Sequence, residues 1–187
     1  MARANPHADL GRRVPVYGET ELLAFVEERS EPLLLVLDCV QDPQNLGACL
    51  RSAYAAGVQA VVTPRRRSAP LSETVRRVAC GAGEKLFFAQ VTNLARALRE
   101  LQELGVRLVG TDHRASSSLY DEDLTGPLAL VLGGEDSGVR RLTAETCDVL
   151  VSIPMAHADV CLNVSAAAAV CLFEAQRQRT SGSPGGS

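Results

Sequence analysis

The chain has 187 residues, of which 46% are hydrophobic and 22% are charged. These proportions exclude a largely disordered chain, and the length suits one domain whose core needs no disulfides. The formal net charge of −3 excludes a protein that coats nucleic acid through bulk charge, so an RNA partner would need a local basic patch. No apolar run reaches the ~20 residues that span a bilayer, and no apolar leader opens the chain. We therefore expect a cytoplasmic protein with no membrane partner.

Strands and helices alternate in the pattern of apolar residues. A polar lead-in with a short helix over 19–29 is expected within 1–30, the main domain over 31–179, and a flexible tail over 180–187. Strands are predicted at 33–37, 58–62, 86–89, 106–110, 128–132 and 149–153, and helices at 45–57, 72–82, 92–104 and 163–179. This alternation predicts an α/β domain with a mostly parallel sheet and helices on both faces.

Ligands bind such sheets beyond the carboxyl ends of the strands, so the loops at 38–45, 110–114, 133–140 and 154–162 are the candidates. In the first loop, Asn45 and Arg51 flank a predicted helix start, where free backbone N–H groups and the helix dipole suit an anion. The alternative is that Asn45 only caps the helix and Arg51 is a solvated charge.

Glycines mark the loop that follows the predicted strand at 128–132. Gly133 and its neighbour allow close backbone approach to a ligand, Gly138 allows a tight turn, and Glu135 could bind a ribose or an amine. An ordinary strand-to-helix turn is the alternative. The segment CGAGE at 80–84 follows a helix and lacks the third glycine of a dinucleotide motif, so we interpret it as a helix C-cap.

The last loop leaves its strand through Ile153, Pro154 and Met155, and Asn163 and Ser165 open a helix of small residues. This pattern fits either a ligand loop with a subunit interface or tight internal packing. A separate group of arginines is the best candidate for a phosphate-binding patch, with a solvated charge run as the alternative: Arg65, Arg66, Arg67, Arg76 and Arg77.

The six cysteines form no CxxC pair, and the three histidines lie far apart in the sequence. These spacings do not favour a zinc site, and we expect no metal. Most of the cysteines have apolar neighbours, so we expect buried free thiols that act as small hydrophobic residues.

Three segments considered together resemble, in order and spacing, the three motifs of the SpoU (TrmH) family of S-adenosylmethionine-dependent RNA ribose 2'-O-methyltransferases. They are the first motif segment at 37–62 (LDCVQDPQNLGACLRSAYAAGVQAVV), the second at 128–143 (LALVLGGEDSGVRRLT) and the third at 151–179 (VSIPMAHADVCLNVSAAAAVCLFEAQRQR). The segment at 78–98 is most similar to the bacterial branch that methylates guanosine in 23S rRNA. The resemblance covers about 31–179.

The resemblance implies a SPOUT-type α/β fold with a deep C-terminal trefoil knot, and a homodimer with the active site near the subunit interface. It places S-adenosylmethionine between the last two motif loops, at Gly133, Glu135, Gly138, Ile153, Pro154, Met155, Leu162, Asn163 and Ser165. The implied catalytic positions are Asn45, Arg51, Glu135 and Asn163. RNA is then the partner, bound by Arg51 and the arginine patch, with rRNA favoured over tRNA.

The implied reaction is in-line methyl transfer from a sulfonium to a ribose hydroxyl, which requires alignment and removal of the hydroxyl proton. Arg51 is the family's proposed base. A guanidinium does not give up its proton in proteins, so we expect Arg51 to bind the substrate phosphate or to stabilise the developing alkoxide.

The third motif segment differs from the family pattern at two positions. The family usually has Gly two residues after the Met and Ser before the Leu-Asn pair, where this chain has His157 and Cys161. A non-catalytic RNA- or cofactor-binding module is therefore an alternative hypothesis, and a nicotinamide enzyme is a weaker one because a complete GxGxxG is absent. The branch usually carries an extra RNA-binding domain before the catalytic one, and we expect no full domain of that kind within 1–30.

Overall fold

The computed structural model describes residues 14–134, 138–157 and 160–181. Seven parallel strands form one sheet in the order β3-β2-β1-β6-β4-β7-β5. In chain order they are β1 (Leu33–Asp38), β2 (Ala60–Pro64), β3 (Phe87–Val91), β4 (Arg107–Thr111), β5 (Ser117–Ser118), β6 (Leu128–Gly133) and β7 (Val149–Ser152). The predicted mostly parallel α/β sheet is confirmed.

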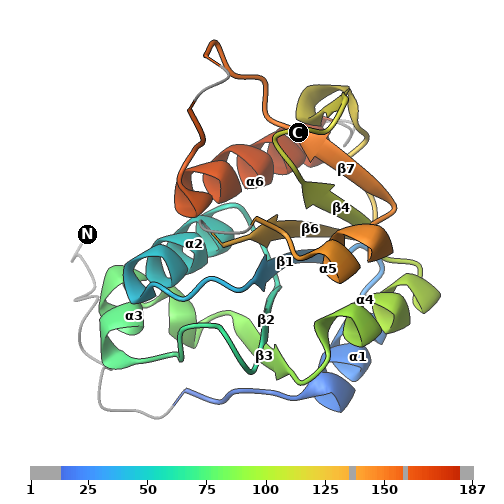
Figure 1. The fold of residues 1–187 in the computed structure, drawn as a ribbon. Helices are drawn as coiled ribbons and strands as arrows, with labels where there is room; N and C mark the ends of the chain where they lie inside the picture. The colour runs from blue at the N-terminus through green and yellow to red at the C-terminus, as the bar shows by residue number, and fades with distance from the viewer. Residues whose placement is uncertain (1–13, 135–137, 158–159, 182–187) are drawn as a thin grey trace, which may run out of the picture.

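Six α-helices and two 3₁₀ turns accompany the strands within the described residues, with α1 before the first strand and α6 after the last. The helices are α1 (Glu19–Glu27), α2 (Pro43–Ala55), α3 (Glu73–Val78), α4 (Leu94–Glu103), α5 (Arg141–Thr146) and α6 (Val164–Ser181), and the turns are η1 (Ala82–Glu84) and η2 (Leu119–Asp121). Figure 1 shows α2, α3 and α6 on one face of the sheet and α1, α4 and α5 on the other. Helices on both faces explain why every residue of β1 and β2 is buried.

Two apolar layers result, one on each face. The first contains Leu35, Leu46 and Leu172 and packs α2 and α6 on the sheet; the second contains Leu34, Leu98 and Leu101 and packs α4. Consecutive residues of β1 enter opposite layers because side chains alternate across a strand. None of the described helices is long and apolar enough to cross a bilayer.

Several element boundaries differ from the predicted ones by local chemistry. The helix predicted at 45–57 begins at Pro43, because Asp42 is the N-cap and its carboxylate accepts from the Gln44 N–H. The helix predicted at 72–82 ends at Val78, where Cys80 and Gly81 take left-handed backbone angles, as the C-cap interpretation of CGAGE expects. Residues 1–13 of the predicted lead-in and residues 182–187 of the predicted tail at 180–187 lie outside the described residues, whereas Thr180 and Ser181 belong to the end of α6.

Candidate functional site

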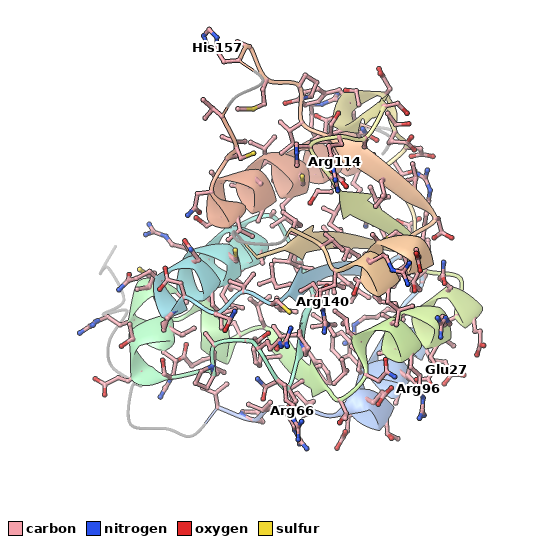
Figure 2. All side chains as sticks on the ribbon, viewed as in Figure 1. Glu27, Arg66, Arg96, Arg114, Arg140 and His157 are labelled. Atoms are coloured by element: carbon pink, nitrogen blue, oxygen red, sulfur yellow. The ribbon has the colours of Figure 1, made fainter. Side chains whose placement is uncertain are left out.

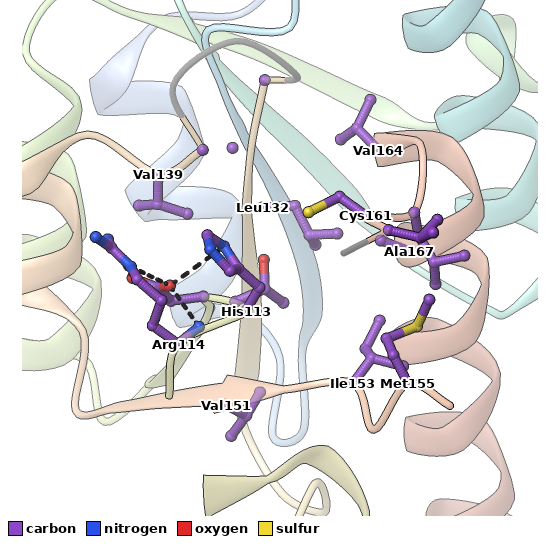
Figure 3. Close-up of a pocket in the computed structure, with 17 residues that line it drawn as sticks. His113, Arg114, Leu132, Val139, Val151, Ile153, Met155, Cys161, Val164 and Ala167 are labelled. Carbon is purple, nitrogen blue, oxygen red and sulfur yellow. Dashed lines mark hydrogen bonds and ion pairs between the residues drawn. The ribbon is translucent and has the colours of Figure 1, made fainter. Parts of the chain in front are cut away.

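A cavity of about 390 Å³ opens where the strands at the centre of the sheet end. Its walls come from the carboxyl ends of β4, β6 and β7, the loops after them and the start of α6, as Figure 3 shows. Strand order reverses beside this point. The chain runs from β1 outward to β2 and β3 on one side of the sheet, and then crosses to β4 on the other side of β1. The carboxyl edge at such a reversal is where ligands bind in open α/β sheets, and the volume suits a small molecule.

Five of the nine predicted cofactor positions line this cavity: Gly133, Gly138, Ile153, Met155 and Leu162. Pro154, Asn163 and Ser165 are not among the lining residues, and Glu135 lies outside the described residues. The loops of the second and third motif segments therefore meet around one cavity, although they come from different strands.

The glycines of the second motif segment allow backbone to approach backbone. A Cβ on Gly133 would lie 1.8 Å from the carbonyl carbon of Gly138, and one on Gly134 would lie 2.4 Å from the Cys39 carbonyl oxygen. Gly138 has a φ of 60°, and its N–H donates to the Gly134 carbonyl at 2.9 Å. The close approach expected of Gly133 is thus made to the chain itself, which shapes one wall of the cavity.

Asp38, the last residue of β1, holds this loop in place and was not singled out from the sequence. It is fully buried, and its carboxylate accepts from the Arg140 backbone N–H at 3.0 Å and from Arg140 Nε at 2.7 Å. Its own carbonyl accepts from the Gly134 N–H at 2.8 Å. One buried residue of the first motif segment therefore binds both ends of the glycine loop. An acid at the end of an otherwise apolar strand was the available sequence feature.

We expect Asp38→Asn to lower the free energy of unfolding by about 1.5–3 kcal/mol, the usual contribution of a hydrogen bond to a charged group. The asparagine oxygen could still accept from one Arg140 group, but its NH2 would place a donor against the other, which is also a donor. Urea unfolding measures the effect, with Glu100→Gln as the control because Glu100 pairs with an exposed arginine on α4. An Asp38→Asn midpoint equal to that of Glu100→Gln would contradict this role.

Two predicted catalytic residues, Asn45 and Asn163, lie in direct contact. The Asn163 amide nitrogen donates to the Asn45 side-chain oxygen at 3.0 Å, across 118 positions of sequence. The Asn163 oxygen accepts from the Ser165 N–H at 2.8 Å and from Ser165 Oγ at 2.6 Å, which is the arrangement of an N-cap at the start of α6. The idea that Asn45 is the N-cap of α2 is wrong, since Asp42 has that role and Asn45 is buried inside the first turns. Arg51 follows on the same helix and is exposed.

The arginines predicted to bind phosphate do not all share one environment. Arg65, Arg66, Arg67 and Arg77 are exposed, and the first three follow the carboxyl end of β2. Arg76 departs from the prediction because its side chain is buried and its Nε lies 2.6 Å from a Glu84 carboxylate oxygen. A guanidinium engaged inside the fold is not part of an open phosphate surface.

The loop after β4 adds three lining residues that sequence reasoning located only as a candidate loop. Arg114 donates to both carboxylate oxygens of Asp112, from Nε at 3.1 Å and from Nη2 at 3.0 Å. These hydrogen bonds lower the pKa of Asp112, with burial opposing them. His113 Nδ1 lies 3.6 Å from Asp112 Oδ1. Figure 3 shows His113 and Arg114 at one side of the pocket.

The two departures from the family pattern lie in different places. Cys161 lines the cavity and is exposed, whereas His157 is exposed and is not among the lining residues. Figure 2 shows His157 at the far end of the loop that joins β7 to α6, pointing away from the body of the molecule. Within the described residues, Cys161 is thus the departure that would touch a ligand in the cavity.

The six cysteines are free, and the expectation of burial holds for only part of them. Cys39, Cys49 and Cys171 are buried, while Cys80 and Cys161 are exposed, so these two contradict it. Burial raises the pKa of Cys171 to about 12, which keeps that thiol neutral. No group of His, Cys, Asp and Glu side chains suited to a metal ion occurs in the part of the chain that the structure describes.

Comparisons with known proteins agree with the motifs. The model of the SpoU rRNA Methylase family matches residues 32–173. The chain is 57% identical over 179 residues to the 23S rRNA (guanosine-2'-O-)-methyltransferase RlmB of Vibrio cholerae, and 54% identical over 180 residues to that of Escherichia coli K12. Each match covers 96% of this chain, with 70% and 71% of the relative's length.

Solved structures show the same fold. The SpoU methyltransferase AviRb from Streptomyces viridochromogenes, in complex with the cofactor AdoMet, superposes with a TM-score of 0.78 at 31% identity. The match covers 82% of this chain and 63% of AviRb. This chain therefore spans less than two thirds of that structure and about 70% of the two RlmB relatives.

Proposed function

Since the chain belongs to the SpoU rRNA methylase family, we propose that it transfers a methyl group from S-adenosylmethionine to a ribose 2'-hydroxyl of RNA, at a guanosine of 23S rRNA. The observation that supports this most is the contact between Asn45 and Asn163. That hydrogen bond joins the helix of the first motif segment to the segment that bounds the cavity. It supports a shared site for Asn45, proposed as catalytic, and Asn163, proposed as both catalytic and cofactor-binding.

The cavity suits S-adenosylmethionine in size and chemistry. Its volume of about 390 Å³ lies in the range of small-molecule pockets. Ile153, Met155 and Leu162 offer apolar contacts for a flat base, and the loop after β4 places charged side chains at the edge of the same cavity. These residues would hold the cofactor.

When bound, the cofactor supplies a methyl group on a sulfonium, which is an activated leaving group. The chain's own residues then have to orient the ribose and stabilise the charge that develops on its oxygen. We assign the positioning to Asn45 and Asn163, whose mutual hydrogen bond fixes both side chains. Arg51 is exposed on α2 and would donate to a phosphate or to the alkoxide, since a guanidinium has only donors.

The arginines after β2 provide a surface for the RNA backbone. Each phosphate contact contributes roughly 0.7–0.9 to the slope of log affinity against log salt. We expect the triple change of Arg65, Arg66 and Arg67 to Ser to reduce that slope by about 2. Filter binding at several salt concentrations measures it, and the Arg96→Ser/Arg99→Ser double variant on α4 is the control. An unchanged slope in the triple variant would exclude this surface.

The homodimer and the knot are part of the proposal. The exposed apolar side chain of Phe173 on α6 would be covered by a second copy. The knot is expected from membership of the family.

Two alternatives to this function are a tRNA substrate and a non-catalytic module. A tRNA substrate is less favoured, because the relatives at 54–57% identity carry a 23S rRNA name. A non-catalytic module is motivated by Cys161, which lines the cavity in place of the usual serine. A thiol is a weaker hydrogen-bond donor than a hydroxyl, so this position is where cofactor affinity would suffer.

Titration calorimetry of the purified chain with S-adenosylmethionine and S-adenosylhomocysteine tests the proposal, alone and with ribosomal RNA present. We expect a Kd in the micromolar range, which corresponds to a binding free energy of about −8 kcal/mol. Binding without methyl transfer to any RNA would favour the non-catalytic module. An absence of binding in both titrations would overturn the proposed function.

A further inference from the structure

Among the described residues that line the cavity, charged side chains are confined to one edge. Among the described lining residues, the ionisable groups other than the Cys161 thiol are Asp112, His113 and Arg114, all from the loop after β4. The facing wall is apolar and comes from β7, the loop after it and α6. Figure 3 shows Arg114 and His113 on one side of the pocket and Ile153, Met155 and Ala167 on the other.

Arg114 is held in one orientation by its neighbour. Two parallel hydrogen bonds from Nε and Nη2 to the Asp112 carboxylate form a fork, and the Arg114 backbone N–H donates to the same carboxylate at 2.9 Å. A fork of this kind uses Nε and one terminal nitrogen, so Nη1 is the group that it leaves for a further acceptor. The side chain of Arg114 is 77% exposed, so a ligand can reach it.

We propose that Arg114 binds the carboxylate at the amino-acid end of the cofactor, and that Asp112 is the positioning residue that orients it. The inference rests on the proposed function. It assigns the adenine to the apolar wall and the amino-acid end to the edge formed by the loop after β4. His113 lies beside this edge, with its Nδ1 3.6 Å from the same carboxylate of Asp112.

An RNA phosphate is the other anion that could meet this guanidinium. The position of Arg114 favours the cofactor, because it lines the same cavity as Gly133, Ile153 and Met155 of the cofactor loops. The arginines proposed for RNA follow β2, which is three strands away from β4 in the sheet. Arg114 is therefore next to the small-molecule cavity and apart from that surface.

Two ligands that differ only at the relevant end test the assignment. S-adenosylhomocysteine carries the amino-acid end, and 5'-methylthioadenosine keeps the adenine, ribose and thioether without it. We expect Arg114→Gln to weaken S-adenosylhomocysteine binding about fivefold, the scale of a solvent-screened ion pair, and to leave 5'-methylthioadenosine binding unchanged. Calorimetry gives both constants without any turnover.

Arg96→Gln is the matched control, because Arg96 is also exposed and also pairs with a carboxylate through Nε, but lies on α4. It should change neither constant. Equal weakening of both ligands in Arg114→Gln would mean a general disturbance of the cavity and would overturn the inference. So would unchanged cofactor-analogue binding with a raised KM for RNA, which would assign Arg114 to a phosphate. Failure of the unaltered chain to bind either ligand would instead count against the proposed function.

Discussion

Replacing Arg51 by alanine is expected to lower kcat/KM for RNA methylation by about 10²–10³, the loss seen when one donor to a developing oxyanion is removed. Arg51 lies on α2, exposed, on the helix that presents Asn45 to Asn163. The change removes a charge from a solvated position, so folding should be nearly unaffected. Initial rates with saturating cofactor measure the effect, and calorimetry with S-adenosylhomocysteine should give the same Kd as the unaltered chain.

Arg51→Lys separates charge from geometry. Lysine keeps the positive charge but lacks the planar fork of donors, so we expect only partial recovery of the rate. Arg99→Ala on α4 is the control, because Arg99 is also an exposed helical arginine. Full activity in Arg51→Lys would contradict bidentate binding by Arg51. Full activity in Arg51→Ala would show that Arg51 has no role in the reaction.

Gly133→Ala should have the largest structural effect. The added Cβ would lie 1.8 Å from the Gly138 carbonyl carbon and 2.0 Å from the Val139 nitrogen, so the backbone of the loop has to move. Overpacking typically costs about 1–3 kcal/mol, and we expect the upper end because both neighbours are backbone atoms. The same movement displaces a wall of the cavity, so S-adenosylhomocysteine affinity should fall by at least ~10-fold.

Gly105→Ala is the matched control for this change. Gly105 has a φ of 81°, and a Cβ there would meet nothing within 4 Å, so the variant carries backbone strain without a clash. We expect it to cost about 1 kcal/mol and to leave ligand binding unchanged. If Gly133→Ala binds the ligand as tightly as Gly105→Ala does, the second motif segment does not shape the cavity.

Local chemistry made most of the fold predictable. The apolar run of β1 is visible in the sequence because this strand is buried on both faces. The amphipathic pattern of α4 is visible because this helix is buried on one face only. The short elements α5 and β5 were missed as ranges, since six and two residues carry too little periodicity to detect. The start of α2 was misplaced because Asp42 and Asn45 are both good capping residues.

The site was predictable in its loops but not in its contacts. Gly138 was expected in a tight turn and has a positive φ. The pair formed by Asp38 and Arg140 joins residues 102 positions apart, and no pattern in one sequence specifies which buried acid meets which arginine. Arg76 was wrongly assigned to a surface patch, because the sequence does not show that its guanidinium is buried and paired with Glu84.

The most direct test of the account is methyl transfer to unmodified 23S rRNA, with the product examined for the position of the methyl group. A 2'-O-methyl group blocks alkaline cleavage of the adjoining phosphodiester, because the attacking hydroxyl is lost. We predict that the chain, supplied with S-adenosylmethionine, makes the bond after one guanosine resistant to alkali. A methyl group transferred to a base instead of a ribose would contradict the proposed function. So would methylation of tRNA with none of 23S rRNA.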